Sequence, residues 1–298
     1  MLMIFALCFT LVYAKQIKHN VEKNSDNWVF TTTWDDVKGN KHQAKYTLDS
    51  QLIKLDIEEP LKYQKNKSAK YSAAKINAWG KKQKGVTVRA AAKKGKVSIR
   101  VSGKLNKVRP TLKKAEAVGN KAQKEYMDQE GYTYLRQGGK KGIIPDHLKH
   151  IEEYSKLLGP LVEALGGPTA DPRAFGFKAL SFVQNIPYEK RALVSDRYRR
   201  PFSLLGRNKG DCDSKAVLYL ALMKAAYPDM PVAMVYIRGH AFGALGIEPQ
   251  KGDMRFKQGE HKFVLVEPVG PKMVKIGKVG PKSRRHFRSK MYKAKVLE

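Results

Sequence analysis

Residues 210–216 read Gly-Asp-Cys-Asp-Ser-Lys-Ala and begin the stretch that decides the fold of this 298-residue chain. Aspartate is a common N-cap residue, and the residues that follow, up to Met223, place apolar side chains at helical spacing. We therefore predict a buried helix from Cys212 to about Tyr227, with the cysteine in its first turn. A thiol in that position lies at the positive end of the helix, which favours the thiolate.

Two residues further along the chain can complete a thiol site with Cys212. His240 lies between small residues, in Gly239-His240-Ala241, where an imidazole has room to act as a general base. Glu267 ends the apolar run 263–266 and can orient that imidazole. The alternative is that Cys212 is a small buried core residue, as a single cysteine in an apolar helix often is.

The segments around these residues predict an α+β core. A helix is expected over 172–185, before the Cys212 helix, and three short strands are expected over 232–238, 240–246 and 262–267. Helices followed by antiparallel strands are typical of an α+β fold.

Four motifs in this region resemble the transglutaminase-like superfamily, in particular the bacterial transglutaminase-like cysteine proteinases. In chain order they are residues 182–188 (Phe-Val-Gln-Asn-Ile-Pro-Tyr), Gly210-Asp211-Cys212, Gly239-His240-Ala241 and Glu267-Pro268, within a match over about 175–270. The resemblance implies a papain-like core with Cys212 as nucleophile, His240 as base and Glu267 in the acid position. Aspartate is more frequent in that position, so another third residue stays open. The resemblance also implies that Gln184 lies on the oxyanion side.

No cofactor and no metal site are predicted. Some members of the superfamily carry a structural zinc on paired cysteines, but this chain has only 2 cysteines and no Cys-x-x-Cys. Gly95 and Gly103 lie in predicted β-structure and not in a strand-to-helix turn, which argues against a phosphate-binding loop.

The N-terminal part of the chain predicts β-structure. Apolar residues alternate over 28–34, 44–48, 86–90 and 97–101, a pattern typical of two hairpins. We expect a basic, sandwich-like all-β domain over 15–108, a helical connector over 109–170, the transglutaminase-like core over 171–270 and a basic extension over 271–298.

Positive charge dominates the chain, with 58 Lys and Arg against 27 Asp and Glu and a formal net charge of +31. A field of this size attracts polyanions. Anionic cell-envelope polymers and lipid head groups are the expected partners; nucleic acid is less favoured because few aromatic residues are interleaved with the charges. The candidate contact residues lie in the predicted β hairpin and near the C-terminus: Arg89, Lys94, Arg100, Arg284, Arg285 and Arg288.

Residues 1–14 are uncharged and end in Val-Tyr-Ala, which is typical of a signal peptide cleaved after Ala14. An uncleaved anchor and a buried first strand are the alternatives. Export to the periplasm or the cell exterior would leave Cys212 as the only cysteine, with no partner for an intramolecular disulfide.

Together these features favour an exported thiol enzyme that cleaves or transfers peptide or isopeptide amide bonds through a thioester on Cys212. Hydrolysis and transamidation share that intermediate, and no residue distinguishes them. The enzyme would act on a protein or peptide substrate while docked on an anionic envelope surface. The alternative is a polyanion-binding envelope protein whose core does not cut.

Overall fold

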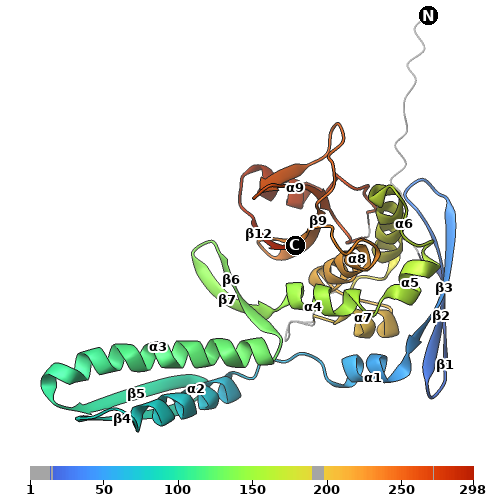
Figure 1. Cartoon of the computed structure of the whole chain (residues 1–298). Helices are drawn as coiled ribbons and strands as arrows, with labels where there is room; N and C mark the ends of the chain where they lie inside the picture. Colours follow the sequence, from blue (N-terminus) through green and yellow to red (C-terminus); the bar gives the residue numbers. More distant parts are fainter. Residues whose placement is uncertain (1–13, 15, 190–197, 271) are drawn as a thin grey trace, which may run out of the picture. The chain divides into compact units, whose positions relative to one another are not determined.

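The computed structural model describes residues 14, 16–189, 198–270 and 272–298, in a mixed α+β fold with several small antiparallel sheets. The expected leader, apart from Ala14, lies outside the described residues. The chain forms two compact units (Figure 1). The large unit comprises the described residues of Met1–Pro60, Arg136–Lys140 and His147–Glu298. The small unit comprises Leu61–Leu135 and Lys141–Asp146.

A five-stranded antiparallel sheet and a buried helix form the centre of the large unit. The strands are β8 (Val232–Ile237), β9 (His240–Leu245), β10 (Arg255–Gln258), β11 (His261–Val266) and β12 (Lys293–Leu297), in the order β10-β11-β9-β8-β12. Helix α8 (Cys212–Ala226) contacts β8 and β9. All residues of β8, and all of β9 after His240, are buried, which explains why their sequences are continuously apolar instead of alternating.

Four helices surround α8: α4 (His147–Ser155), α5 (Gly159–Ala164), α6 (Pro172–Asn185) and α7 (Pro201–Arg207). Helix α6 begins where the sequence predicts, because the Asp171 side chain accepts a hydrogen bond from Arg173 N and Pro172 occupies the first turn. The predicted helices over 172–185 and from Cys212, and the three strands after them, are confirmed.

The large unit also contains a three-stranded antiparallel sheet of β1 (Gln16–Lys23), β2 (Asn27–Asp35) and β3 (Lys41–Asp49), followed by α1 (Ser50–Glu58). Trp34 of β2 is fully buried. Its indole nitrogen donates to Ser181 Oγ of α6 at 2.9 Å, and its ring lies edge-on to Phe182, with centroids 5.2 Å apart. This sheet therefore packs on the helices of the large unit.

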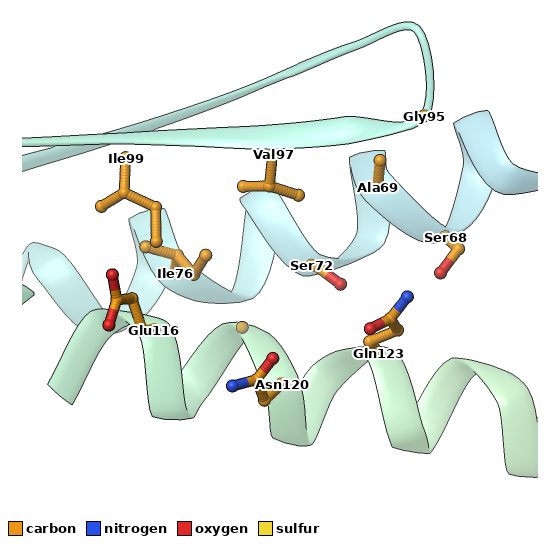
Figure 2. A pocket seen from close by; sticks show the side chains of 11 residues that line it. Ser68, Ala69, Ser72, Ile76, Gly95, Val97, Ile99, Glu116, Asn120 and Gln123 are labelled. Atoms are coloured by element: carbon orange, nitrogen blue, oxygen red, sulfur yellow. The ribbon is translucent and has the colours of Figure 1, made fainter. Parts of the chain in front are cut away.

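The small unit combines two helices, α2 (Lys65–Gly80) and α3 (Leu105–Gln129), with the hairpin of β4 (Val86–Lys93) and β5 (Lys96–Gly103). Its core centres on Ile76, Val88 and Ala115. Polar side chains of α2 and α3 and apolar side chains of β5 line a cavity of about 380 Å³ between these elements (Figure 2). A second hairpin, β6 (Tyr132–Gln137) and β7 (Lys140–Pro145), turns at Gly138 and Gly139, which both have positive φ. Its turn, Arg136–Lys140, belongs to the large unit and the rest of it to the small unit.

The prediction of an all-β domain over 15–108 is wrong. Residues 50–58 and 65–80 are helical, and the two predicted hairpins belong to different compact units. Helix α1 starts because the Asp49 side chain accepts hydrogen bonds from Gln51 N and Leu52 N. Helix α2 follows from Ala69, Ala73 and Ile76, which repeat at helical spacing and are all buried.

The connector and the C-terminal extension also differ from the prediction. Helix α3 begins at Leu105, before the connector expected over 109–170, and it includes Pro110. Residues 272–298 of the expected extension are part of the large unit, because β12 pairs with β8 at the edge of the five-stranded sheet and α9 (Pro281–Arg288) precedes it.

Candidate active site

Cys212 is the first residue of α8 and is 4% exposed. Asp211 caps the helix, and its side chain accepts a hydrogen bond from Ser214 N at 3.2 Å. A Cβ atom at position 210 would lie 2.7 Å from Leu204 Cδ1, so a larger residue there would displace the Leu204 side chain of α7. Gly210 thus allows close packing at the start of α8, and Asp211 caps the turn that carries the thiol.

His240 and Glu267 lie at the same end of two neighbouring strands of the five-stranded sheet. His240 is the first residue of β9, and Glu267 directly follows β11. The two strands are antiparallel and pair Val266 with Gly243, so the start of one lies beside the end of the other. The His240 Nε2 atom is in hydrogen-bond contact with Glu267 Oε1.

Glu267 is buried and held on both sides. Its second carboxylate oxygen, Oε2, accepts a hydrogen bond from Gly280 N at 3.2 Å. Since a buried carboxylate needs hydrogen-bond partners, the Gly280 amide and the His240 ring together stabilise it in this position. The backbone of the segment before α9 therefore supplies the second partner of this carboxylate.

The Cys212 thiol interacts with the same imidazole. Burial alone lowers the pKa of His240, but hydrogen bonds to Cys212 and Glu267 and the charges of both groups outweigh burial and raise the pKa to about 9. Because Nε2 faces Glu267, Nδ1 is the ring nitrogen left for the thiol. The fold therefore brings the three sequence-predicted residues together, and their arrangement can support transfer of a proton from sulfur to nitrogen.

Gln184 has a different place from the one expected. Its Nε2 donates to Glu267 O at 2.8 Å and to Val274 O at 3.0 Å, which uses both amide hydrogens. These bonds fix the backbone that carries the Glu267 carboxylate. Gln184 is thus placed to position the acid and has no side-chain donor left for an oxyanion.

Lys215 is a buried residue of this region that sequence reasoning missed. It is 0% exposed, one turn after Cys212, and its Nζ donates to Gln184 O at 3.1 Å and Ile186 O at 2.7 Å. Burial lowers its pKa to about 7. The lysine ties the end of α6 to the start of α8, and its signal in the sequence is a cation directly before the apolar run 216–223.

Asp213 provides a second ionisable group beside the thiol. Its Oδ1 lies 4.0 Å from Cys212 Sγ, and its Oδ2 lies 3.4 Å from Nε2 of the buried His147. The other ring nitrogen of His147 is 2.8 Å from Tyr236 Oη. His147 of α4, itself held by Tyr236 of β8, therefore fixes the Asp213 side chain next to the sulfur. No sequence motif pointed to these two residues.

The six basic residues predicted to bind polyanions form two separate groups. Arg89, Lys94 and Arg100 are exposed on the β4–β5 hairpin of the small unit, where Arg89 and Arg100 are directly opposed across the strands. The others, Arg284, Arg285 and Arg288, are exposed on α9 of the large unit. Within the described residues, no ion pair involves any of the six.

No family model, no curated protein and no solved structure matches this chain. In the part of the chain that the structure describes, no group of three or more His, Cys, Asp or Glu is placed to hold a metal ion. Over the same residues, the helices are all too short or too polar to cross a lipid bilayer.

Proposed function

We propose that this protein is a thiol-dependent amide hydrolase of the transglutaminase-like type, with Cys212 as nucleophile, His240 as general base and Glu267 as the residue that orients the imidazole. The observation that carries the proposal is the position of His240, whose ring interacts with the Cys212 thiol and the Glu267 carboxylate at once. A papain-like arrangement of the core is part of this proposal, because the helix that begins with Cys212 packs on β9, which begins with His240 and pairs with β11.

The reaction would run from the pair in which His240 Nδ1 already holds the proton of Cys212 Sγ, in keeping with the raised pKa of His240, and the sulfur attacks the carbonyl carbon of an amide. The developing oxyanion needs donors at fixed positions, and the backbone N–H of Cys212 at the start of α8 is the natural one. His240 then gives its proton to the leaving amine, and the C–N bond breaks to leave a thioester.

In the second half of the reaction, water would give a proton to His240 and attack the thioester carbonyl. Collapse of this adduct breaks the C–S bond, and the proton returns to the sulfur, so that a carboxylic acid and the free thiol result. An amine in place of the water would give transamidation by the same steps. Peptide and isopeptide amides are the proposed substrates, and hydrolysis is preferred because water requires no dedicated acceptor site.

The experiment that tests this proposal compares wild type with Cys212→Ala and Cys212→Ser on a mixed peptide library, with products read by mass spectrometry. Both variants are expected to lose all cleavage, while their thermal unfolding stays within a few degrees of wild type. Normal turnover by the alanine variant would rule out the thioester route.

A second proposed property is binding of the small unit to an anionic polymer or lipid surface, which would hold the enzyme at a cell envelope after export. It rests on Arg89 and Arg100, which are exposed and directly opposed on β4 and β5, an arrangement of like charges that costs stability in an isolated hairpin. Counterion release would make such binding fall steeply with salt. The double change Arg89→Gln and Arg100→Gln should reduce sedimentation with anionic vesicles, whereas Lys113→Gln with Lys114→Gln on α3 serves as a charge-matched control.

A further inference from the structure

A basic cavity of about 790 Å³ lies beside the β8–β9 turn of the large unit. The turn of the β6–β7 hairpin, the β8–β9 turn and the segment between α9 and β12 contribute its lining. All of these residues belong to the large unit. Gln137 Nε2 donates to Tyr236 O at 3.1 Å, and Lys293 pairs with Tyr236 across β12 and β8, so two of the three walls are attached to the same strand.

Cations make up much of the cavity lining. Five exposed basic residues face it: Arg136, Lys140, Arg238, Lys290 and Lys293. The lining contains no acidic residue, and none of the five takes part in an ion pair between described residues. Because like charges around one concavity repel each other and focus the field within it, an anionic ligand would relieve the repulsion and bind there.

The cavity also has an apolar part. Met291 is 55% exposed, and Tyr292 lies next to it, in a lining that otherwise consists mainly of cations. The Tyr292 ring is stacked on Phe287, with centroids 4.6 Å apart, so one of its faces is already covered. Recognition of single-stranded nucleic acid uses aromatic faces that are open to the bases. An aliphatic side chain next to carboxylates suits this lining better than a nucleobase.

We propose that this cavity binds an acidic, partly aliphatic segment of the peptide substrate, next to the amide bond that is cut. The inference rests on the proposed hydrolase function. Arg238 lines the cavity and is two residues before His240, a spacing that spans at most about 7 Å. Because His240 contacts Cys212, a substrate chain needs only a few residues to reach from the thiol to the cavity. The cations that sequence reasoning selected on α9 do not line the cavity, whereas the β8–β9 turn joins it directly to the general base.

The test uses the full-length Cys212→Ala protein, so that binding can be measured whether or not the wild type cuts. The probe is a fluorescein-labelled decapeptide of alternating Glu and Leu, compared with its Gln-Leu analogue by fluorescence anisotropy. The pocket variant adds Arg238→Gln and Lys293→Gln. The control adds Arg284→Gln and Arg285→Gln, which remove the same charge from the exposed face of α9.

We expect the pocket variant to bind the acidic peptide roughly tenfold more weakly, as the loss of two charge contacts predicts, and the control to stay within about twofold. Equal loss in both variants would overturn the proposal, because a general positive field would then explain the binding. Equal binding of the Gln-Leu analogue, or displacement of the peptide by an oligonucleotide of the same charge at the same concentration, would also overturn it. Binding without any turnover by wild type would leave the pocket standing and refute only the hydrolase function.

Discussion

Replacement of Glu267 by glutamine should separate the charge of this residue from its shape. The variant keeps the length of the side chain and an oxygen that can accept from Gly280 N, but it removes the negative charge next to His240 Nε2. Burial lowers the pKa of His240, and the negative charge of Glu267 is one of the contributions that raise it again. Without that charge, the effect of burial is less fully compensated. The pKa of His240 should therefore fall.

The size of the effect follows from the elevation of the His240 pKa from its ordinary value of 6.5 to about 9. This difference corresponds to about 3 kcal/mol in favour of the imidazolium. Glu267 and Cys212 share it, so we expect the glutamine variant to lose roughly one to two pKa units. At pH 8 the protonated fraction of the ring would drop from about 90% to between about 10% and 50%.

The same shift makes a prediction for stability. A His240 pKa that is higher in the folded than in the unfolded protein stabilises the fold fully below pH 6.5, and this contribution is lost as the pH rises through about 9. In the Glu267→Gln protein the loss should begin and end at lower pH.

The assay is an NMR titration of the histidine rings, in which the His240 signal is assigned by its absence from His240→Ala. Glu260→Gln, an exposed glutamate in the turn before β11, is the matched control and should leave the titration of His240 unchanged. If His240 titrates alike in wild type and Glu267→Gln, the carboxylate does not hold the imidazole and the reasoning is refuted.

Three further predictions test the surroundings of the site. Burial lowers the pKa of Lys215 from 10.5 to about 7, so between these pH values the unfolded chain binds more protons than the folded one, and this lysine makes stability rise with pH. Lys215→Met should remove that rise when the free energy of urea unfolding is compared at pH 7 and pH 10, and an unaltered pH dependence would contradict the prediction. Trp34→Ala removes a fully buried indole that packs on α6 and should cost about 3–5 kcal/mol in the same assay; a loss below about 1 kcal/mol would mean that β2 does not pack there. Gly239 has φ of 69°, so Gly239→Ala should strain the turn before His240 by about 1–2 kcal/mol. The free-energy loss in peptide cleavage should exceed the loss in unfolding free energy, and equal losses in both would argue for a purely structural turn.

The parts of the fold that the sequence predicted well are those with strong local patterns. Helix α8 contains the apolar run 216–223, and the short strands β8, β9 and β11 each contain an apolar run that ends near a Gly, Pro or charged residue, so their type and approximate bounds could be read from the residues. The meeting of Cys212, His240 and Glu267 was expected from the order of the motifs and from the family resemblance that they carry, and the local runs place each residue at a helix start or a strand end.

The parts that were missed depend on contacts between distant residues. Strand β12 has the lysine-rich sequence Lys-Ala-Lys-Val-Leu and becomes a strand because β8 has an open edge for it. Gln184 and Gly280 reach Glu267 from segments whose sequences show no catalytic pattern. The helical residues 65–80 were hidden among lysines, because only the spacing of Ala69, Ala73 and Ile76 shows the buried face.

The most direct test of the central claim is the rate at which iodoacetamide alkylates Cys212 in the native protein between pH 5 and pH 9, in wild type and in His240→Ala. If His240 stabilises the thiolate, Cys212 of wild type should react well below pH 8, and the variant should lose most of this reactivity at the same pH. Alkylation only after denaturation, or an identical pH profile in the two proteins, would show that Cys212 is a buried core residue and not an activated nucleophile.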